Sequence, residues 1–443
     1  MHYLQQILFL ITLSVAAYFI RKRVLRILAN INLGKPNEIN DHFSDRLSNM
    51  LLVAFGQKKM FKRFVPAVLH FFIYVGFLII NLEVLEFVID GLLGTHRIFA
   101  PYLGSFYNVL MNVFEFLAVA VLLACVFFLV RRNVLKVPRF WSAEMTRWPR
   151  LDANLILITE IILMTAILTM NASDQVLQTR DDHYTATGIL FFSSFLTSTL
   201  DPLNIPALIF IERFAWWFHI IGILGFAIYI TYSKHLHIFL AFPNTYFANL
   251  APKGHINNMP VVTREVKSML GLTVADSSAP AVAGRFGAKD INDLSWNNLM
   301  AAYSCTECGR CTSECPANLT GKKLSPRKIM MDVRDRMEEV GSSPLFRRGA
   351  GGEVIPEDGK TLLNDYITKE EINACTSCNA CVEACPVLIN PLEIILELRR
   401  YVAMEESGSP AQLNSMFQNI ETSFAPWKFS PADRFNWAKE IKP

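Results

Sequence analysis

Eight of the nine cysteines fall into two short runs with one shared spacing. The runs read "CTECGRCTSECP" (305–316) and "CTSCNACVEACP" (375–386). Both fit the pattern C-x₂-C-x₂-C-x₃-C-P, in which thiolates bind iron–sulfur clusters. A zinc site is the alternative, but zinc usually takes paired CxxC motifs or mixed Cys/His sets. Two complete copies of the pattern therefore favour two [4Fe–4S] clusters.

The fourth cysteine of each run is predicted to bind the other cluster. The first three thiolates converge on one cubane, while the fourth cysteine begins the next helix and points away. Cluster 1 is therefore expected to use Cys305, Cys308, Cys311 and Cys385, and cluster 2 to use Cys375, Cys378, Cys381 and Cys315. The ninth cysteine, Cys125, stands alone in an apolar run and is expected to pack as a small apolar residue.

The segments around the two runs have a helical pattern. Residues 316–374 lie between Cys315, the last cysteine of the first run, and Cys375, the first of the second, which is far more chain than a compact β-type ferredoxin needs. Within this insert, 325–340 has an early proline and apolar residues on a helical period. Short helices are predicted at 369–374 and 391–406, on either side of the second run, and 341–361 is predicted to be a loop.

The N-terminal half is apolar enough to lie in a membrane. Hydrophobic residues make up 52% of the chain and charged residues only 18%, and the net charge of +3 is too small to indicate a nucleic-acid partner. A membrane-spanning helix takes about 20 residues. Five apolar segments reach or approach that length, at roughly 4–20, 65–89, 106–130, 152–170 and 208–233.

Positive charge is distributed unevenly between the connections of these segments. Lys and Arg are concentrated in 21–63 and 131–150, whereas the other two connections carry one basic residue each, Arg97 and Arg180. Basic loops stay on the cytoplasmic side of a membrane. We therefore expect an inner-membrane protein with its N-terminus outside and its cysteine runs in the cytoplasm. The apolar stretch 188–200 is too short to span and is predicted to be an interfacial or re-entrant helix.

Histidines lie in or beside the apolar segments, where an ionisable side chain indicates a function. His70 is near the inner end of the second segment, His219 is in the outer half of the fifth, and His235 and His237 follow at its inner end. On one continuous helix, His219 and His237 would be five turns apart on the same face, about 27 Å along the axis.

Imidazoles on facing helices of a bundle can hold a b-type haem, and we predict this for His70 and His237. Interhelical hydrogen bonding is the alternative for all of these histidines. His219 fits either interpretation, and His235 is expected to be a surface or propionate contact.

Two acidic residues lie towards the outer end of the second segment, at the depth of His219. They are Glu83 and Glu86. A quinone site needs a proton donor or acceptor beside a redox centre, so both are candidates for such a site. The alternative is that they are bundle-facing carboxyls, either protonated or paired with Arg97.

The number of spans, their orientation and the histidine positions resemble the five-helix cytochrome b subunit family of respiratory nitrate reductase, over about residues 1–245. That family holds two haems between its second and fifth helices. The resemblance implies that His70 and His237 hold the inner haem and that His219 is one ligand of an outer haem. The second outer ligand would fall at Ile80, which cannot bind iron, so the sequence leaves a second haem open.

The cysteine half, about 290–405, resembles the α-helical ferredoxin module of heterodisulfide reductases. With the apolar half, the chain resembles a subunit of a membrane-bound, heterodisulfide-reductase-like iron–sulfur oxidoreductase. Such systems carry a catalytic module with paired CCG motifs, and this sequence has no adjacent cysteines. We therefore expect substrate chemistry on a partner, either a CCG-type iron–sulfur subunit or a flavoprotein, docked at "FRRG" (346–349) or near Trp427 and Trp437.

The expected fold is mainly α, with a haem b membrane domain (1–243), a linker (244–290), a ferredoxin domain (291–405) and a tail (406–443). The expected function is electron relay between menaquinone or another quinone, haem b, the two clusters and the partner. The alternatives are a subunit of an electron-transfer-flavoprotein:quinone oxidoreductase, an iron–sulfur redox sensor and a transporter-like protein with an appended ferredoxin.

Overall fold

The computed structural model of the protein is mainly helical and describes residues 3–272, 285–342, 346–348, 354–356 and 358–441. Five of the described helices are long and apolar enough to cross a membrane: α1 (Leu4–Ile31), α3 (Phe64–Leu93), α5 (Ser105–Asn133), α6 (Arg147–Leu177) and α8 (Ile205–Ile230). The predicted number and order of apolar helices is therefore confirmed.

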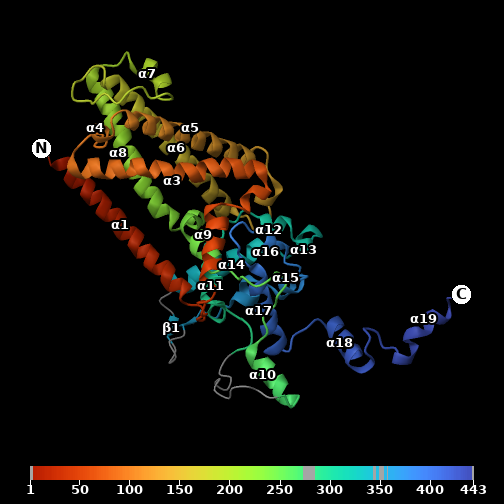
Figure 1. The fold of residues 1–443 in the computed structure, drawn as a ribbon. Coiled ribbons are helices and arrows are strands. Elements are labelled where there is room, and N and C mark those ends of the chain that lie inside the picture. Colours follow the sequence, from red (N-terminus) through yellow and green to blue (C-terminus); the bar gives the residue numbers. More distant parts are fainter. Residues whose placement is uncertain (1–2, 273–284, 343–345, 349–353, 357, 442–443) are drawn as a thin grey trace.

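These helices form a bundle in which α6 packs along both α5 and α8, and α3 packs along α5. Helix α1 lies obliquely against α3 and α8 (Figure 1). Its Phe9 is fully buried against Trp216 and Trp217 of α8. The same ring lies over Gly91 of α3, where a Cβ atom would be only 2.7 Å from it. A glycine at this position is what lets α1 approach so closely.

Short elements connect the long helices. Between α1 and α3 they are α2 (Phe43–Met50), the π-helical turn η1 (Leu51–Phe55) and η2 (Met60–Lys62); the later ones are α4 (Ala100–Leu103), η3 (Pro138–Phe140) and α7 (Ser194–Leu200). Helix α7 forms within the stretch predicted to be interfacial, and it lies at the end of the bundle away from the cysteine runs (Figure 1). The Glu115 carboxylate of α5 fixes this loop by accepting hydrogen bonds from the backbone N–H groups of Phe192 and Ser193, at 3.0 and 3.1 Å.

The cysteine runs lie in a second, helical domain. Its elements are η5 (Ile291–Asp293), α11 (Trp296–Tyr303), α12 (Arg310–Ser313), α13 (Pro316–Leu319), α14 (Pro326–Ser342), η6 (Leu362–Tyr366), α15 (Lys369–Asn373), α16 (Ala380–Ala384) and α17 (Pro391–Met404). Helices α14, α15 and α17 confirm the three helices predicted around the runs.

One predicted loop contains regular structure. Within 341–361, the backbone forms two antiparallel strands, β1 (Phe346–Arg348) and β2 (Val354–Pro356). A glycine-rich segment between short apolar stretches is a hairpin signal, and the sequence interpretation missed it. Of the predicted docking segment 346–349, the side chains and Gly349 lie outside the described residues.

The predicted linker is partly built into the two domains. Helix α9 (His237–Tyr246) crosses the expected boundary at 243, and the short helix α10 (Pro260–Met269) lies inside the predicted linker. Ala288 is fully buried, and its N–H donates to the carbonyl of Glu397 at 2.9 Å. Asp290 pairs with the buried Arg336 at 2.8 Å. The cysteine domain therefore begins before the expected residue 291.

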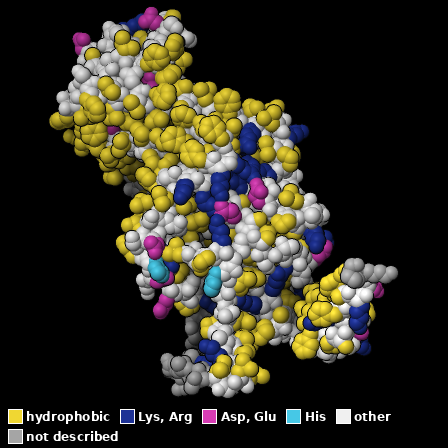
Figure 2. Space-filling view, turned by 45° about the vertical axis from the view of Figure 1, so that its right-hand side comes forward, with side chains coloured by type: hydrophobic (Ala, Val, Ile, Leu, Met, Phe, Trp, Pro, Cys, Tyr) yellow, Lys and Arg dark blue, Asp and Glu magenta, His cyan; other side chains and the backbone are white. Residues whose placement is uncertain are grey.

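The two domains share one hydrophobic core, which joins Ile27 and Ile31 of α1 to α11, α14 and α17. Polar contacts reinforce this junction, because Arg23 of α1 makes a two-pronged pair with Glu338 of α14 at 2.9 and 2.5 Å. Hydrophobic side chains cover the bundle, and Lys and Arg side chains gather where it meets the cysteine domain (Figure 2). The cysteine domain is therefore held at the basic end of the bundle.

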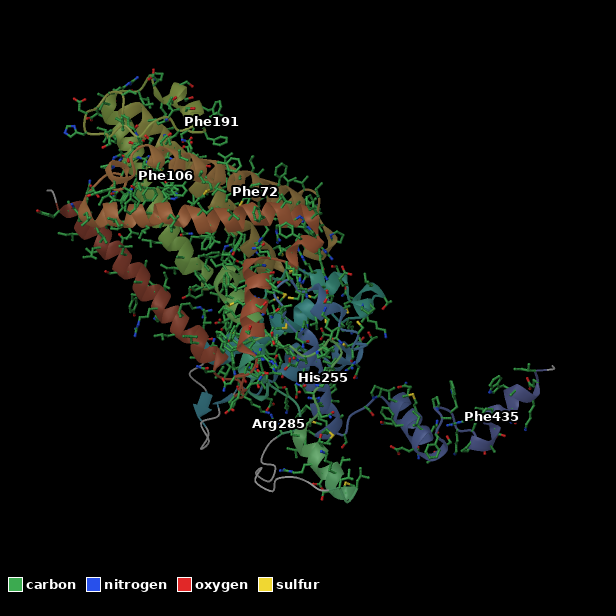
Figure 3. The ribbon with its side chains drawn as sticks, viewed as in Figure 1. Phe72, Phe106, Phe191, His255, Arg285 and Phe435 are labelled. Atoms are coloured by element: carbon green, nitrogen blue, oxygen red, sulfur yellow. The ribbon has the colours of Figure 1, made fainter. Side chains whose placement is uncertain are left out.

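The tail leads away from the cysteine domain as α18 (Ala411–Ser423), η7 (Pro431–Phe435) and α19 (Asn436–Lys439). Trp427 and Trp437 are 69% and 62% exposed. Figure 3 shows Phe435 of the same tail far from Phe106 and Phe191 on the bundle. The tail thus presents exposed aromatic side chains, as its proposed docking role requires.

Candidate functional site

The two cysteine loops share a pair of left-handed backbone positions. In the first run, Glu307 and Gly309 adopt φ angles of 54° and 70°; in the second run, the equivalent Ser377 and Asn379 adopt 54° and 60°. These left-handed positions are uncommon for residues other than glycine. They curl each loop around its sulfur atoms, and the N–H of Ser377 donates to the Sγ atom of Cys375 at 3.4 Å. Both loops are therefore shaped to surround a cluster.

A small cavity marks the second cluster site. It is lined by Leu324, Pro326, Leu392 and Ile395 together with the sulfur-bearing residues Cys315, Cys375, Cys378 and Cys381. Cys315 comes from the first run and reaches this cavity because it caps the short helix α13. The predicted ligand set of cluster 2 thus surrounds one apolar space.

The predicted ligands of cluster 1 are also neighbours. Burial, followed by the nearby thiols of Cys308, Cys305 and Cys385, raises the pKa of Cys311 well above its usual value. Burial and the neighbouring Cys308 raise the pKa of Cys385 to about 11. Thiols packed together in this way lose their protons only if a nearby cation compensates the negative charge of the thiolates. Bound iron would supply that positive charge.

One local expectation is wrong. Cys315 does begin a helix, but Cys385 ends α16 and is followed by a turn, and the next helix starts only at Pro391. The N–H of Ile389 in this turn donates to the Sγ atom of Cys385 at 3.3 Å. The loop therefore turns Cys385 towards the first run without a helix.

No group of three or more His, Cys, Asp or Glu side chains within the described ranges is placed to hold a single metal ion. A cubane is larger than one ion, and each of its irons takes one thiolate at a separate corner. Four cysteines around a cavity, as at the second site, match the cubane geometry better than the convergent geometry of zinc.

A much larger cavity, of about 400 Å³, runs through the inner half of the bundle to the first cysteine loop. This volume is in the usual range of cofactor pockets. His70 of α3 and His237 of α9 face each other across it, with ring centroids 6.4 Å apart. Two imidazole nitrogens, each bound to one iron at about 2 Å, place the ring centres about 6 Å apart. The pair therefore fits a bis-histidine haem.

The hydrogen bonds of the two rings fix their tautomers. The Nδ1–H group of His70 donates to the Oε1 atom of Gln57, and that of His237 donates to the carbonyl of Lys234, both at 3.1 Å. Each ring thereby keeps its Nε2 atom unprotonated for a metal. Gln57 is 7% exposed and holds a φ of 50°, so its backbone is constrained to place this amide.

The predicted continuous helix through His219 and His237 is wrong. Helix α8 ends at Ile230, and a turn and η4 (Lys234–Leu236) precede α9. His219 and His237 therefore lie on two different helices, and the spacing of five helical turns expected between them does not apply. His219 nevertheless lines the same cavity, and its Nδ1–H group donates to the carbonyl of Leu163 at 3.0 Å. Ile80 also lines this cavity, as the sequence position suggested.

Charged groups join the cavity to the first cysteine loop. Glu307, 3% exposed, pairs with Lys234 of η4 and with Arg334 of α14, the latter at 2.6 Å. Burial acts to raise the pKa of Glu307, but the charges of Arg334 and Lys234 outweigh it and lower that pKa. His235, Arg132 and Arg139 also line the cavity.

The outer acidic residues differ in their contacts. Glu86 accepts hydrogen bonds from the hydroxyl of Tyr107 at 2.7 Å and from the N–H of Phe99 at 3.0 Å, so both of its oxygens are engaged. Glu83 is 3% exposed, and its Oε1 atom has no hydrogen-bond partner in the described chain. Arg97 pairs with Asp174 instead of these glutamates. These contacts favour a structural role for Glu86.

Several site residues were not foreseen from the sequence, above all Gln57, Glu307 and the arginines of the cavity wall. The sequence could have indicated Glu307, because the cysteine loop fixes the position of an acidic residue that lies between two predicted cluster ligands. Nothing in the sequence indicated Gln57, because no helical spacing brings it close to His70.

Comparison with known proteins gives the same overall picture. Residues 304–389 match the family model described as "4Fe-4S dicluster domain". Over 98% of its length the chain is 29% identical to "Probable iron-sulfur-binding oxidoreductase FadF" of Bacillus subtilis (strain 168), covering 61% of that protein. Over 90% of its length it is 26% identical to "EtfAB:quinone oxidoreductase" of Syntrophomonas wolfei subsp. wolfei, covering 55% of that protein.

A third match is 28% identical over 33% of the chain, to one of the subunits of the "Dihydromethanophenazine:CoB--CoM heterodisulfide reductase" of Methanosarcina mazei, and covers 35% of that protein. No solved structure matches. The chain spans about three fifths of the length of the first two relatives. It is thus similar to heterodisulfide-reductase-like iron–sulfur oxidoreductases with a membrane region, which confirms that expected resemblance.

Proposed function

We propose that the protein relays electrons between a membrane quinone, haem b and two [4Fe–4S] clusters, and passes them to or from a cytoplasmic partner. The observation that carries this proposal is the cavity whose wall includes His70 and His237 together with Cys308 of the first cysteine run. A haem held by the two histidines would lie beside cluster 1, with no intervening layer of protein.

We infer the order of the carriers from the exposure of their predicted ligands. Every predicted ligand of cluster 1 is buried or half-buried, whereas Cys378, a predicted ligand of cluster 2, is exposed. Cluster 2 is therefore the carrier closest to solvent and the natural contact for a partner. We place the basic end of the bundle and this exposed cluster in the cytoplasm, according to the positive-inside rule.

The partner is proposed to be a CCG-type iron–sulfur protein, because relatives of the chain include part of a heterodisulfide reductase. A flavoprotein is the second candidate, favoured by the relative named EtfAB:quinone oxidoreductase. Pull-down with the purified chain distinguishes the two, since only the flavoprotein brings a flavin absorbance.

For the quinone, Glu83 is the better of the two candidates. Its buried carboxyl has an oxygen without a hydrogen-bond partner in the described residues, whereas both oxygens of Glu86 are occupied. A buried carboxyl with a free oxygen can exchange a proton with a quinol bound beside it.

The proposal is tested by pyridine haemochrome and iron analysis of purified protein. Wild-type protein should contain b haem and about eight non-haem irons. His70→Ala and His237→Ala should each lose a haem. His183→Ala is the matched control, because that ring is 93% exposed and contacts Asp181 away from the cavity. Full haem content in both cavity variants would refute the ligand pair, and zinc in place of iron would refute the clusters.

A further inference from the structure

The wall of the large cavity carries two arginines that form no ion pair with a carboxylate of the described residues. Arg132, at the end of α5, and Arg139, in η3, both line the cavity together with Cys308 and His237. The Nε atom of each arginine is buried and has no hydrogen-bond partner among the described residues. A buried hydrogen-bond donor without a partner is costly, so these two Nε–H groups indicate an anion that completes the site.

The nearby carboxylates compensate this pair only in part. Burial lowers the pKa of Arg132, and it outweighs the charges of Glu307 and Asp152, which act to raise that pKa. Of the acidic residues in the cavity wall, Glu307 already pairs with Lys234 and Arg334. Glu160 also lines the cavity but forms no ion pair with an arginine in the described chain. Burial, followed by the charge of Arg63, lowers the pKa of Arg139 to about 10, which is the direction expected for an uncompensated cation.

The two guanidinium groups are held in place. Both lie on the ring of Phe140, at 4.5 Å for Arg132 and 4.9 Å for Arg139 from its centroid. The Cβ atom of Arg139 is 3.3 Å from where a Cβ would lie on Gly309, so this arginine packs directly on the first cysteine loop. Such fixed, planar donors suit a carboxylate, which arginine binds through two parallel hydrogen bonds.

We propose that Arg132 and Arg139 form a carboxylate-binding subsite for the two propionates of the haem that His70 and His237 hold. This inference rests on the proposed haem. A haem is an apolar disc with two carboxylates on one edge, and the cavity offers an apolar bundle interior at one end and these guanidinium groups at the other. The propionate edge would then face the loop of cluster 1, and the two arginines would raise the haem potential by favouring the added electron.

The first test compares haem with its dimethyl ester, which lacks the negative charges. Haem-free full-length protein, prepared from cells starved of haem, is reconstituted with each compound. Wild-type protein should prefer haem by about tenfold or more, as expected for a buried charged hydrogen bond of about 1.5–3 kcal/mol. The double variant Arg132→Gln/Arg139→Gln should lose this preference. Arg150→Gln is the matched control, because it lies in the same basic connection and contacts Trp141 outside the cavity.

The second test is an optical redox titration of the haem. In the double variant the haem should be harder to reduce, with its equilibrium constant for reduction lowered about tenfold, and Arg150→Gln should leave it unchanged. If the double variant loses its haem, the single variants Arg132→Gln and Arg139→Gln are compared in its place, and each should show a smaller preference for haem over its ester than wild type. An unchanged preference in both single variants would overturn the proposal.

The remaining outcomes are also decisive. An unchanged preference for haem over its ester, with unchanged potential, would overturn the subsite but leave the haem itself in place. A wild-type protein that binds no haem would instead overturn the proposed function. If the difference between wild type and variant appears only in vesicles with phosphatidylglycerol, and not in neutral detergent, the anion is a lipid phosphate and the propionate assignment is refuted.

Discussion

Changing Glu307 to glutamine should loosen the first cysteine loop from the membrane bundle. The carboxylate is 3% exposed and joins Lys234, on the bundle side, to Arg334 of α14. Removing one partner of a buried ion network costs about 3–5 kcal/mol, because it leaves the other charges uncompensated. Glutamine keeps the shape of the side chain, so we expect the lower end, about 3 kcal/mol.

This energy translates into a measurable rate. If iron is lost from a locally opened loop, a cost of about 3 kcal/mol raises the population of that opened state about a hundredfold. The assay is the anaerobic bleaching of cluster absorbance in moderate urea with an iron chelator. Glu314→Gln is the control, because this glutamate of the same run is 53% exposed and pairs with Arg63 on the surface. Such a pair contributes about 1 kcal/mol or less.

The stabilising contribution of Glu307 should decrease only at acidic pH. The pKa of Glu307 is lowered in the folded protein, so its contribution is complete above the ordinary glutamate pKa and is lost as the pH falls through the lowered value. The ratio of bleaching rates between Glu307→Gln and wild type should therefore be constant around neutral pH and shrink only in acid. Equal bleaching of the Glu307→Gln and Glu314→Gln proteins at neutral pH would refute the reasoning.

Three further predictions concern the clusters and the bundle. Cys315→Ala should remove the EPR signal of cluster 2 and spare that of cluster 1; the reverse result would contradict the exchange of fourth ligands. Phe9→Ala should lower the thermal denaturation temperature in detergent, since deleting a buried Phe costs about 3–5 kcal/mol, while exposed Leu10→Ala should not. After iron is removed, Cys378 should react with a thiol-labelling reagent faster than the other cysteines of the second run, because it is the exposed one.

Much of the fold was accessible from the sequence because it follows from local periodicity. The apolar segments gave the five long helices, since a run of that length and hydropathy has few other stable forms. The helices at α14 and α17 followed in the same way from their apolar period. The hairpin of β1 and β2 and the break between α8 and α9 were missed, because short turns depend on a few residues and carry no periodic signal.

The pattern of the cysteines determined by itself which chemistry the protein is built for, because the spacing of thiolates along a loop is a local property. What only the tertiary structure decided is how these local units combine. It brought Cys315 beside Cys375, and it placed Gln57 against His70. It also turned Arg132 and Arg139 into the cavity that ends at Cys308. These residues are distant in sequence, and only the packing of the bundle against the cysteine domain brings them together.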